Sequence, residues 1–145
     1  MATKLRNPLE TAFSGVISAA SVGTSNIYKG FSSGDKALPC VICSAKSVEE
    51  EPLFSGNYRA VVEIMVKGIG ALDADAVDPL TAFDTLCSLV YDAIRIDDLA
   101  TQLMANSTGL TVWRASSGTK VSWDTDEDCF VERYEVEIYC CPRDF

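Results

Sequence analysis

The stretch Tyr58-Arg-Ala-Val-Val-Glu-Ile-Met-Val-Lys67 decides the fold class of this chain. Its apolar residues recur at every second position, which is the period of a β-strand that buries one face. The set on the buried face is Ala60, Val62, Ile64 and Val66. The opposite, half-polar face carries Arg59, Val61, Glu63, Met65 and Lys67. This pattern predicts a long strand in a sheet that has one core face and one partly polar face.

An acidic segment leads into this strand. Leu38 to Ser44 predicts a short apolar strand, so Ala45 to Gly56 becomes the connection between two antiparallel strands. A hairpin needs only about two to five residues, and this connection is longer. It carries Glu49, Glu50, Glu51, Leu53 and Phe54. Apolar residues beside charges are typical of a protein-docking loop, although a plain solvated connection is the alternative.

Three helices are expected from their start signals and from helical apolar spacing. Asn7-Pro8-Leu9-Glu10 predicts the start of the first, with Asn as cap and Pro at the first helical position. Asp78-Pro79 predicts the start of the second in the same way. Asp97-Asp98 is expected to cap a short third helix that ends by Gly109. The Ser- and Gly-rich residues 21–37 are expected to form a long loop or arm.

Three more strands complete the expected order of elements. Leu110–Ser116 and Thr119–Trp123 are separated by Ser-Gly, which predicts a hairpin between them. After an acidic turn, Phe130 to Cys140 is the last strand, with Arg133, Glu135 and Glu137 on its outward face. Helix, two strands, two helices and three strands predict an α+β fold. We expect a single domain over residues 1–145, with a mostly antiparallel sheet and helices packed on one face.

The composition argues against several classes of function. The chain has 145 residues, 48% of them hydrophobic, so it can bury a core as one domain. Its net charge of −9 is unsuited to wrapping a DNA duplex and favours a basic protein partner. It has no histidine, which excludes Ser-His-Asp and Cys-His nucleophile systems and His-ligated metal sites. Carboxylate or lysine chemistry stays open.

Local motifs point to no cofactor and no metal. Cys40-x-x-Cys43 lies in an expected strand, where residues three apart face opposite sides, so buried structural thiols are favoured over zinc. Asp124-x-Asp126-x-Asp128 with Glu135 has the spacing of a calcium loop, but Cys129 replaces the turn glycine and strands flank it. No apolar run approaches the roughly 20 residues that span a bilayer, so we expect a cytosolic product with no membrane partner.

The layout from Pro39 to Pro142 resembles a known family. The acidic connection ends in Ser55-Gly-Asn-Tyr-Arg59, and the second helix begins Asp78-Pro-Leu-Thr-Ala-Phe-Asp-Thr-Leu86. The last strand reads Phe130-Val-Glu-Arg-Tyr-Glu-Val-Glu-Ile-Tyr-Cys-Cys141. Together these stretches resemble the tail terminator (tail completion) and neck proteins of tailed bacteriophages.

The resemblance implies a structural virion protein and no enzyme. Such proteins form a hexameric ring that caps the tail tube, contacts head-completion or connector proteins and lets DNA pass through its lumen. The chain would be made in the host cytoplasm and end in the virion. We expect the interface residues to be Glu49, Glu50, Glu51, Leu53, Phe54, Arg59, Glu63, Lys67, Arg133, Glu135 and Glu137.

Three other functions stay open from the residues. One is another neck or tail-tube component of the same assembly. A second is a small cytosolic binding module whose acidic loop contacts a basic partner. A third is a carboxylate-dependent hydrolase, because with 21 Asp and Glu residues some carboxylates will lie close together.

Overall fold

A computed structural model describes residues 3–30, 37–52, 56–69, 79–107, 109–126 and 129–142. Within these residues the chain forms a single α+β domain of three helices and a six-stranded, mostly antiparallel sheet. The helices are α1 (Thr3–Ala19), α2 (Pro79–Ala93) and α3 (Leu99–Ala105). The strands are β1 (Ile27–Lys29), β2 (Cys40–Glu50), β3 (Tyr58–Ile69), β4 (Leu110–Ala115), β5 (Thr119–Asp126) and β6 (Cys129–Pro142). The expected fold class is therefore confirmed.

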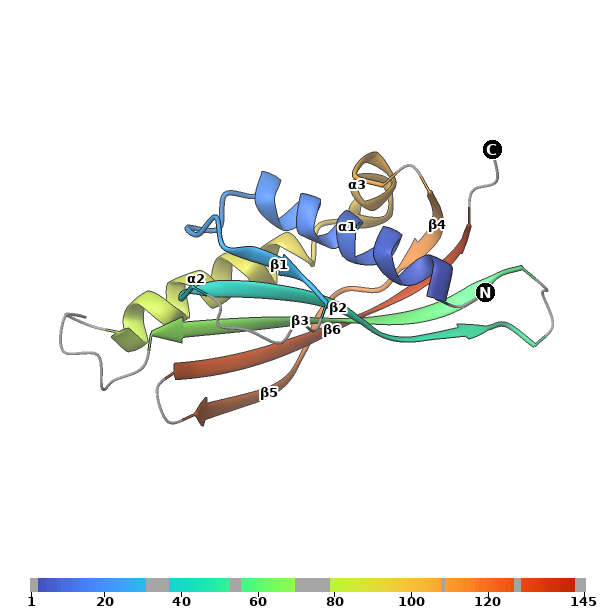
Figure 1. Ribbon diagram of the computed structural model, residues 1–145. Coiled ribbons are helices and arrows are strands. Elements are labelled where there is room, and N and C mark those ends of the chain that lie inside the picture. Colours follow the sequence, from blue (N-terminus) through green and yellow to red (C-terminus); the bar gives the residue numbers. More distant parts are fainter. Residues whose placement is uncertain are drawn as a thin grey trace.

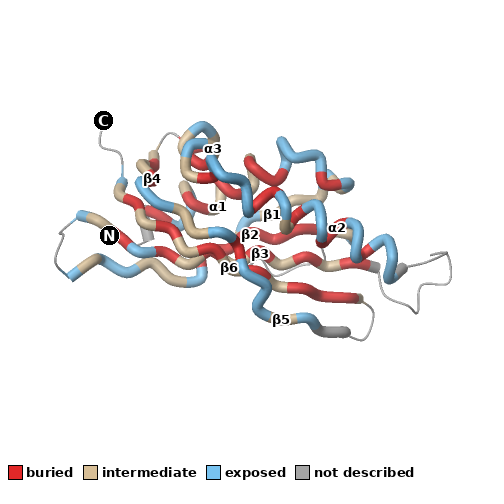
Figure 2. Tube along the Cα trace, turned by 180° about the vertical axis from the view of Figure 1, so that it is seen from behind, coloured by how far each residue is buried: buried red, intermediate tan, exposed pale blue. Residues whose placement is uncertain are grey.

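All three helices pack against the same face of the sheet (Figure 1). The strand order is β1-β2-β3-β6-β4, and β5 pairs with β6 beside β4. On β3 the predicted face is confirmed, since Ala60, Val62, Ile64 and Val66 are fully buried. Figure 2 shows buried and intermediate residues alternating along β3 and β6. One face of the sheet thus belongs to the core under the helices, and we call the other the open face.

The first helix begins five residues earlier than the predicted first helical position, Pro8. α1 starts at Thr3 and contains Pro8 in its interior. Proline at this sixth helical position removes one main-chain hydrogen bond and crowds the carbonyl four residues earlier, which costs about 3 kcal/mol in a helix interior. The additional turn places Leu5 in the core, 1% exposed, on the same face as Leu9 and Phe13. Burial of this leucine overrides the start signal at Asn7-Pro8.

Residues 21–37 are not wholly the loop that their composition predicts. β1 lies within them and pairs in parallel with Val41–Cys43 of β2. The Thr24 hydroxyl and the Asn26 side-chain amide both donate to the Pro39 carbonyl, at 3.0 and 3.1 Å. A three-residue strand is too short for a periodic signal, so its tertiary hydrogen bonds decide its conformation. Residues 31–36 lie outside the described part of the chain.

The predicted long connection between the first two sheet strands is wrong. β2 continues to Glu50, and its register with β3 shifts between Ala45 and Ser47. A bulge of this kind adds one residue and reverses the side-chain alternation, which hides the strand from a period-two search. Glu49 and Glu50 consequently belong to the strand, and the connection shrinks to residues 51–57. Leu53 and Phe54 lie outside the described residues.

The predicted hairpin between Leu110–Ser116 and Thr119–Trp123 is also wrong. β4 pairs with the end of β6 and β5 pairs with its beginning, so both lie along the same edge of β6. The Ser116 N–H and hydroxyl bond the Glu137 carbonyl, and the Gly118 N–H donates to the Ile94 carbonyl of the α2–α3 connection. β4 and β5 therefore form one interrupted edge strand. At the break, the hydrogen bond from Gly118 to Ile94 holds the chain against the helix layer.

Candidate functional site

The open face of the sheet mixes charged and apolar side chains. It is assigned from the β-ladder, in which residues that pair with one another point to the same side. Its described members include Ile42, Ser44, Glu49, Arg59, Val61, Glu63, Met65, Lys67, Arg114, Arg133, Glu135, Glu137 and Tyr139. Most are only partly exposed, although none of the three described helices lies over this face (Figure 1).

Two ion pairs form across this face within one chain. The Arg59 guanidinium donates from Nε (2.9 Å) and Nη2 (2.5 Å) to Oε2 of Glu137. Lys46 Nζ lies 2.6 Å from Oε2 of Glu135. The hydrogen bonds from Arg59 and then Tyr139 hold the pKa of Glu137 below its ordinary value. Surface pairs of this kind add little stability and weaken in salt, so they remain available for exchange with a partner's charges.

The other charges predicted for the interface are placed on the same face. Glu63 sits opposite Glu135 in the ladder, and Met65 sits opposite Arg133. Arg133 Nη1 donates to the Ser122 hydroxyl at 3.5 Å. Among the described residues no ion pair involves Glu63, Lys67 or Arg133. The structure thus brings the six predicted charges of β3 and β6 to one surface.

An aromatic and basic group on β4 was missed by the sequence prediction. Trp113 is 55% exposed and packs on the Tyr139 ring with centroids 5.2 Å apart. The Arg114 guanidinium lies over the same ring, 5.5 Å from its centroid. The β4–β6 register shifts between Val112 and Arg114, which places both Trp113 and Arg114 beside Tyr139. A tryptophan followed by arginine in an expected strand was the available signal.

The acidic segment lies at the end of the long β2–β3 hairpin, which extends past the helix layer (Figure 1). Glu49 and Glu50 are exposed on β2. The Glu51 N–H donates to the Asn57 carbonyl at 2.8 Å, and the Gly56 N–H donates to Glu50 Oε2 at 3.2 Å. These bonds close the connection, so one of the three glutamates supports local structure.

A buried polar cluster lies on the core face beneath α2. Glu132 is 6% exposed and accepts a hydrogen bond from the Tyr134 hydroxyl, while Lys120 Nζ lies 2.9 Å from its Oε1. Burial opposes ionisation of Glu132, but hydrogen bonds from Tyr134, Lys120 and Cys87 outweigh it and hold its pKa below the ordinary value. Burial and then Glu132 raise the pKa of the Cys87 thiol. A protonated thiol is a weak nucleophile, so this geometry suits packing.

The other buried thiols follow the same physics. Burial raises the pKa of both Cys43 and Cys140 to about 12. Cys40 and Cys43 both lie on β2, as predicted from the strand pattern.

Glu135, the last residue of the calcium-like motif, is six residues along β6 from Cys129, or about 20 Å in an extended strand. Glu135 therefore lies far from the start of β6, as the sequence pattern predicts for an extended strand, and Asp128 lies outside the described residues.

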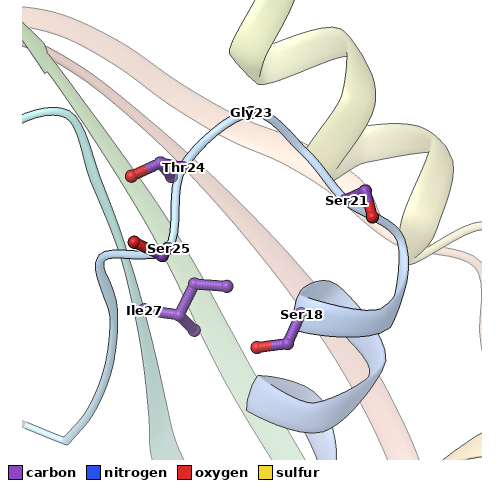
Figure 3. Close-up of a pocket in the computed structure, with 6 residues that line it drawn as sticks. All are labelled: Ser18, Ser21, Gly23, Thr24, Ser25 and Ile27. Carbon is purple, nitrogen blue, oxygen red and sulfur yellow. The ribbon is translucent and has the colours of Figure 1, made fainter.

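Two surface hollows lined by described residues carry little chemistry. The larger, of about 400 Å³, lies where α1 ends and is lined by Ser18, Ser21, Gly23, Thr24, Ser25 and Ile27. Figure 3 shows the Ile27 side chain pointing across it toward Ser18. A smaller hollow of about 220 Å³ lies between α1 and α3, and Asp98 is its one charged lining residue. Uncharged hydroxyls and alanines offer weak recognition of a substrate.

Comparison with models of known protein families and with curated proteins returned no match. Among the described residues, no three His, Cys, Asp or Glu side chains are grouped so that they could hold a metal ion. No helix in the described part of the chain is long and apolar enough to cross a membrane.

Proposed function

We propose that this protein is a structural virion protein of a tailed phage. It forms a tail terminator ring that caps the tail tube, joins it to the head-completion or connector proteins and lets DNA pass through its lumen. The proposal rests on the resemblance of Pro39 to Pro142 to that family and on the open face of the sheet. A ring of six copies would carry six times the net charge of −9, which favours a lumen that repels DNA.

The open face is the observation that supports an assembly function best. β2, β3 and β6 are 11, 12 and 14 residues long, so they present a broad, continuous surface. Val61 and Met65 stand on it between exchangeable ion pairs. Apolar positions within a polar rim are the usual composition of protein interfaces. The protein would thus act through contacts with other proteins rather than through catalysis.

A small binding module is the second candidate. The exposed Glu49 and Glu50 on a projecting hairpin favour it, because they suit a basic partner. Such a module works as a monomer, whereas a terminator must form a closed assembly. The two candidate functions therefore predict different oligomeric states for this protein.

Electron microscopy of the protein mixed with tail tubes of the parent phage tests the proposed function. We expect rings with a central opening, located at tube ends. Tubes that stay uncapped beside a monomeric protein would contradict the terminator function. Capping that disappears in Arg59→Glu or in Arg133→Glu would assign the open face to that contact, with Arg95→Glu on the helix side as the control that makes the same single charge reversal.

A further inference from the structure

The sheet has two different edges at the end that carries the hairpin. Glu50 pairs with Tyr58, Tyr58 with Cys140, and Cys140 with Val112. At this level the strand order is therefore β2, β3, β6 and β4, with β2 and β4 outermost. A sheet edge presents main-chain N–H and C=O groups that can pair with another strand.

The edge formed by β2 is acidic. Among the described residues, β1 pairs only with Val41–Cys43. Farther along, the main chain of Ala45 is bonded from α1: Arg6 donates to its carbonyl, and Glu10 accepts from its N–H at 2.9 Å. Beyond Ala45, Ser47–Glu50 pairs with β3 alone among the described residues. This outer segment, which we call the acidic edge, presents the exposed Glu49 and Glu50.

The edge formed by β4 is basic and aromatic. Within the described residues β4 is paired with β6 alone. Trp113 and Arg114 pack on Tyr139 and stay exposed. Arg114 has no carboxylate partner within ion-pair distance among the described residues. Tryptophan, tyrosine and arginine are the residues that most often dominate binding energy, so this basic edge is well suited to contact.

The two edges match in direction and in level. Three antiparallel pairings separate β2 from β4, so the two strands run in opposite directions. Glu49 pairs with Arg59, Arg59 with Tyr139, and Tyr139 with Arg114, which places all four in one row on the open face. A second copy set beside the first in the same orientation would bring its acidic edge antiparallel to the basic edge, with Glu49 next to Arg114.

We propose that the acidic edge of one copy adds to the basic edge of the next, so that the sheet continues from subunit to subunit. Glu49 then pairs with Arg114 and Trp113 becomes covered. This contact joins two different surfaces of the same chain, and such a contact generates a ring when the rotation closes. The inference rests on the self-assembly part of the proposed function and names the surfaces that carry it.

Charge reversal at the two positions tests the contact. Glu49→Arg and Arg114→Glu each place like charges in it, and each variant alone should need on the order of a hundredfold higher concentration to assemble. Mixing the two variants in equal amounts should restore assembly in alternating order. Each contact then again joins one arginine to one glutamate, either the two introduced side chains or the native Glu49 and Arg114. Light scattering after size exclusion and native mass spectrometry give the mass and the alternating composition.

Matched controls keep the test specific. Asp92→Arg and Arg95→Glu make the same charge changes on exposed positions of the α2 region and should assemble like the wild type. Circular dichroism confirms folding, and the milder Glu49→Gln and Arg114→Gln replace any variant that fails to fold. Single variants that assemble normally, or a mixture that stays dissociated, would overturn the edge contact.

The outcomes separate this inference from the proposed function. If the wild type forms rings and both charge-reversal variants assemble normally, the terminator function stands and the edge contact is removed. If the mixture regains assembly but does not cap tail tubes, the edge contact stands and the terminator function is removed. Binding of a labelled oligothymidylate that Arg114→Glu abolishes, together with a monomeric wild type, would assign the basic edge to single-stranded DNA and overturn the proposal.

Discussion

Glu132 is the residue whose environment departs most from that of an ordinary surface carboxylate. It lies on the core face of β6 between Val131 and Arg133, and its partners come from β5, β6 and α2. The period-two pattern of β6 places position 132 on the core side together with Phe130 and Tyr134. The pattern can therefore flag a buried glutamate, but it cannot show that Lys120 is there to pair with it. The pairing depends on the β5–β6 register.

Glu132→Gln should destabilise the protein at pH 7 by about 1–3 kcal/mol, because Lys120 and Tyr134 lose a charged partner. The folded state lowers the pKa of Glu132 below its ordinary value of 4.5. Its contribution is thus complete above that pH and is lost as the pH falls through the lowered pKa. Urea unfolding at pH 7 and pH 3 should show the variant's deficit shrinking in acid. An equal deficit at both values would contradict the ion-pair account, and Glu63→Gln is the control.

At the level of elements, the break between β4 and β5 depends on a close approach that only glycine permits. A Cβ on Gly118 would lie 2.5 Å from Cδ1 of Ile94, a fully buried side chain. Ser-Gly between two strand-like runs signals a hairpin in many sequences, whereas here it lets an edge strand bend around the helix layer. The difference is decided by the helix layer, because Ile94 also accepts the Gly118 N–H.

Gly118→Ala should lower the free energy of unfolding by about 1–3 kcal/mol through overpacking against Ile94. Ser117→Ala, one residue earlier and exposed, should change it little. Chemical denaturation followed by circular dichroism measures both. If the two variants were equally stable, the break would not depend on this contact.

The bulge of β2 is held by α1 in a similar way. Glu10 accepts from the N–H of Ala45, which is 2% exposed. Glu10→Ala should cost about 1–3 kcal/mol because a buried donor loses its partner. Glu10→Gln retains an acceptor and should cost clearly less. Thermal unfolding compares them, and equal losses would mean that Glu10 acts through its charge rather than through this bond.

Across the whole molecule, the strongly periodic segments could be predicted from the sequence, whereas the features that depend on tertiary contacts could not. β3, β6 and the start of α2 follow from alternation and from Pro79. The extra turn of α1, the short β1, the bulge in β2 and the β4–β5 break all depend on partners distant in sequence. For the site, the charges of β3 and β6 were foreseen, whereas Trp113 and Arg114 became visible only when β4 was placed on Tyr139.

Fluorescence of Trp113 should report assembly. The chain has two tryptophans, and Trp123→Phe leaves Trp113 as the only one. Trp113 is 55% exposed in the single subunit. In the assembled protein we expect reduced quenching of Trp113 fluorescence by acrylamide. Dilution to the monomer should increase this quenching. Quenching that is the same at every concentration would place Trp113 outside the contact, and the Trp113→Phe variant, which reports Trp123, serves as the comparison.

Native mass spectrometry of the wild-type protein over a range of concentrations tests the central claim of self-assembly most directly. A closed ring predicts one dominant species of fixed subunit number, six by the family resemblance, with little population between it and the monomer. Salt should weaken this species because charge pairs contribute to its contacts. A protein that stays monomeric at every concentration, with and without tail tubes, or that grows into an open series of sizes, would contradict the account.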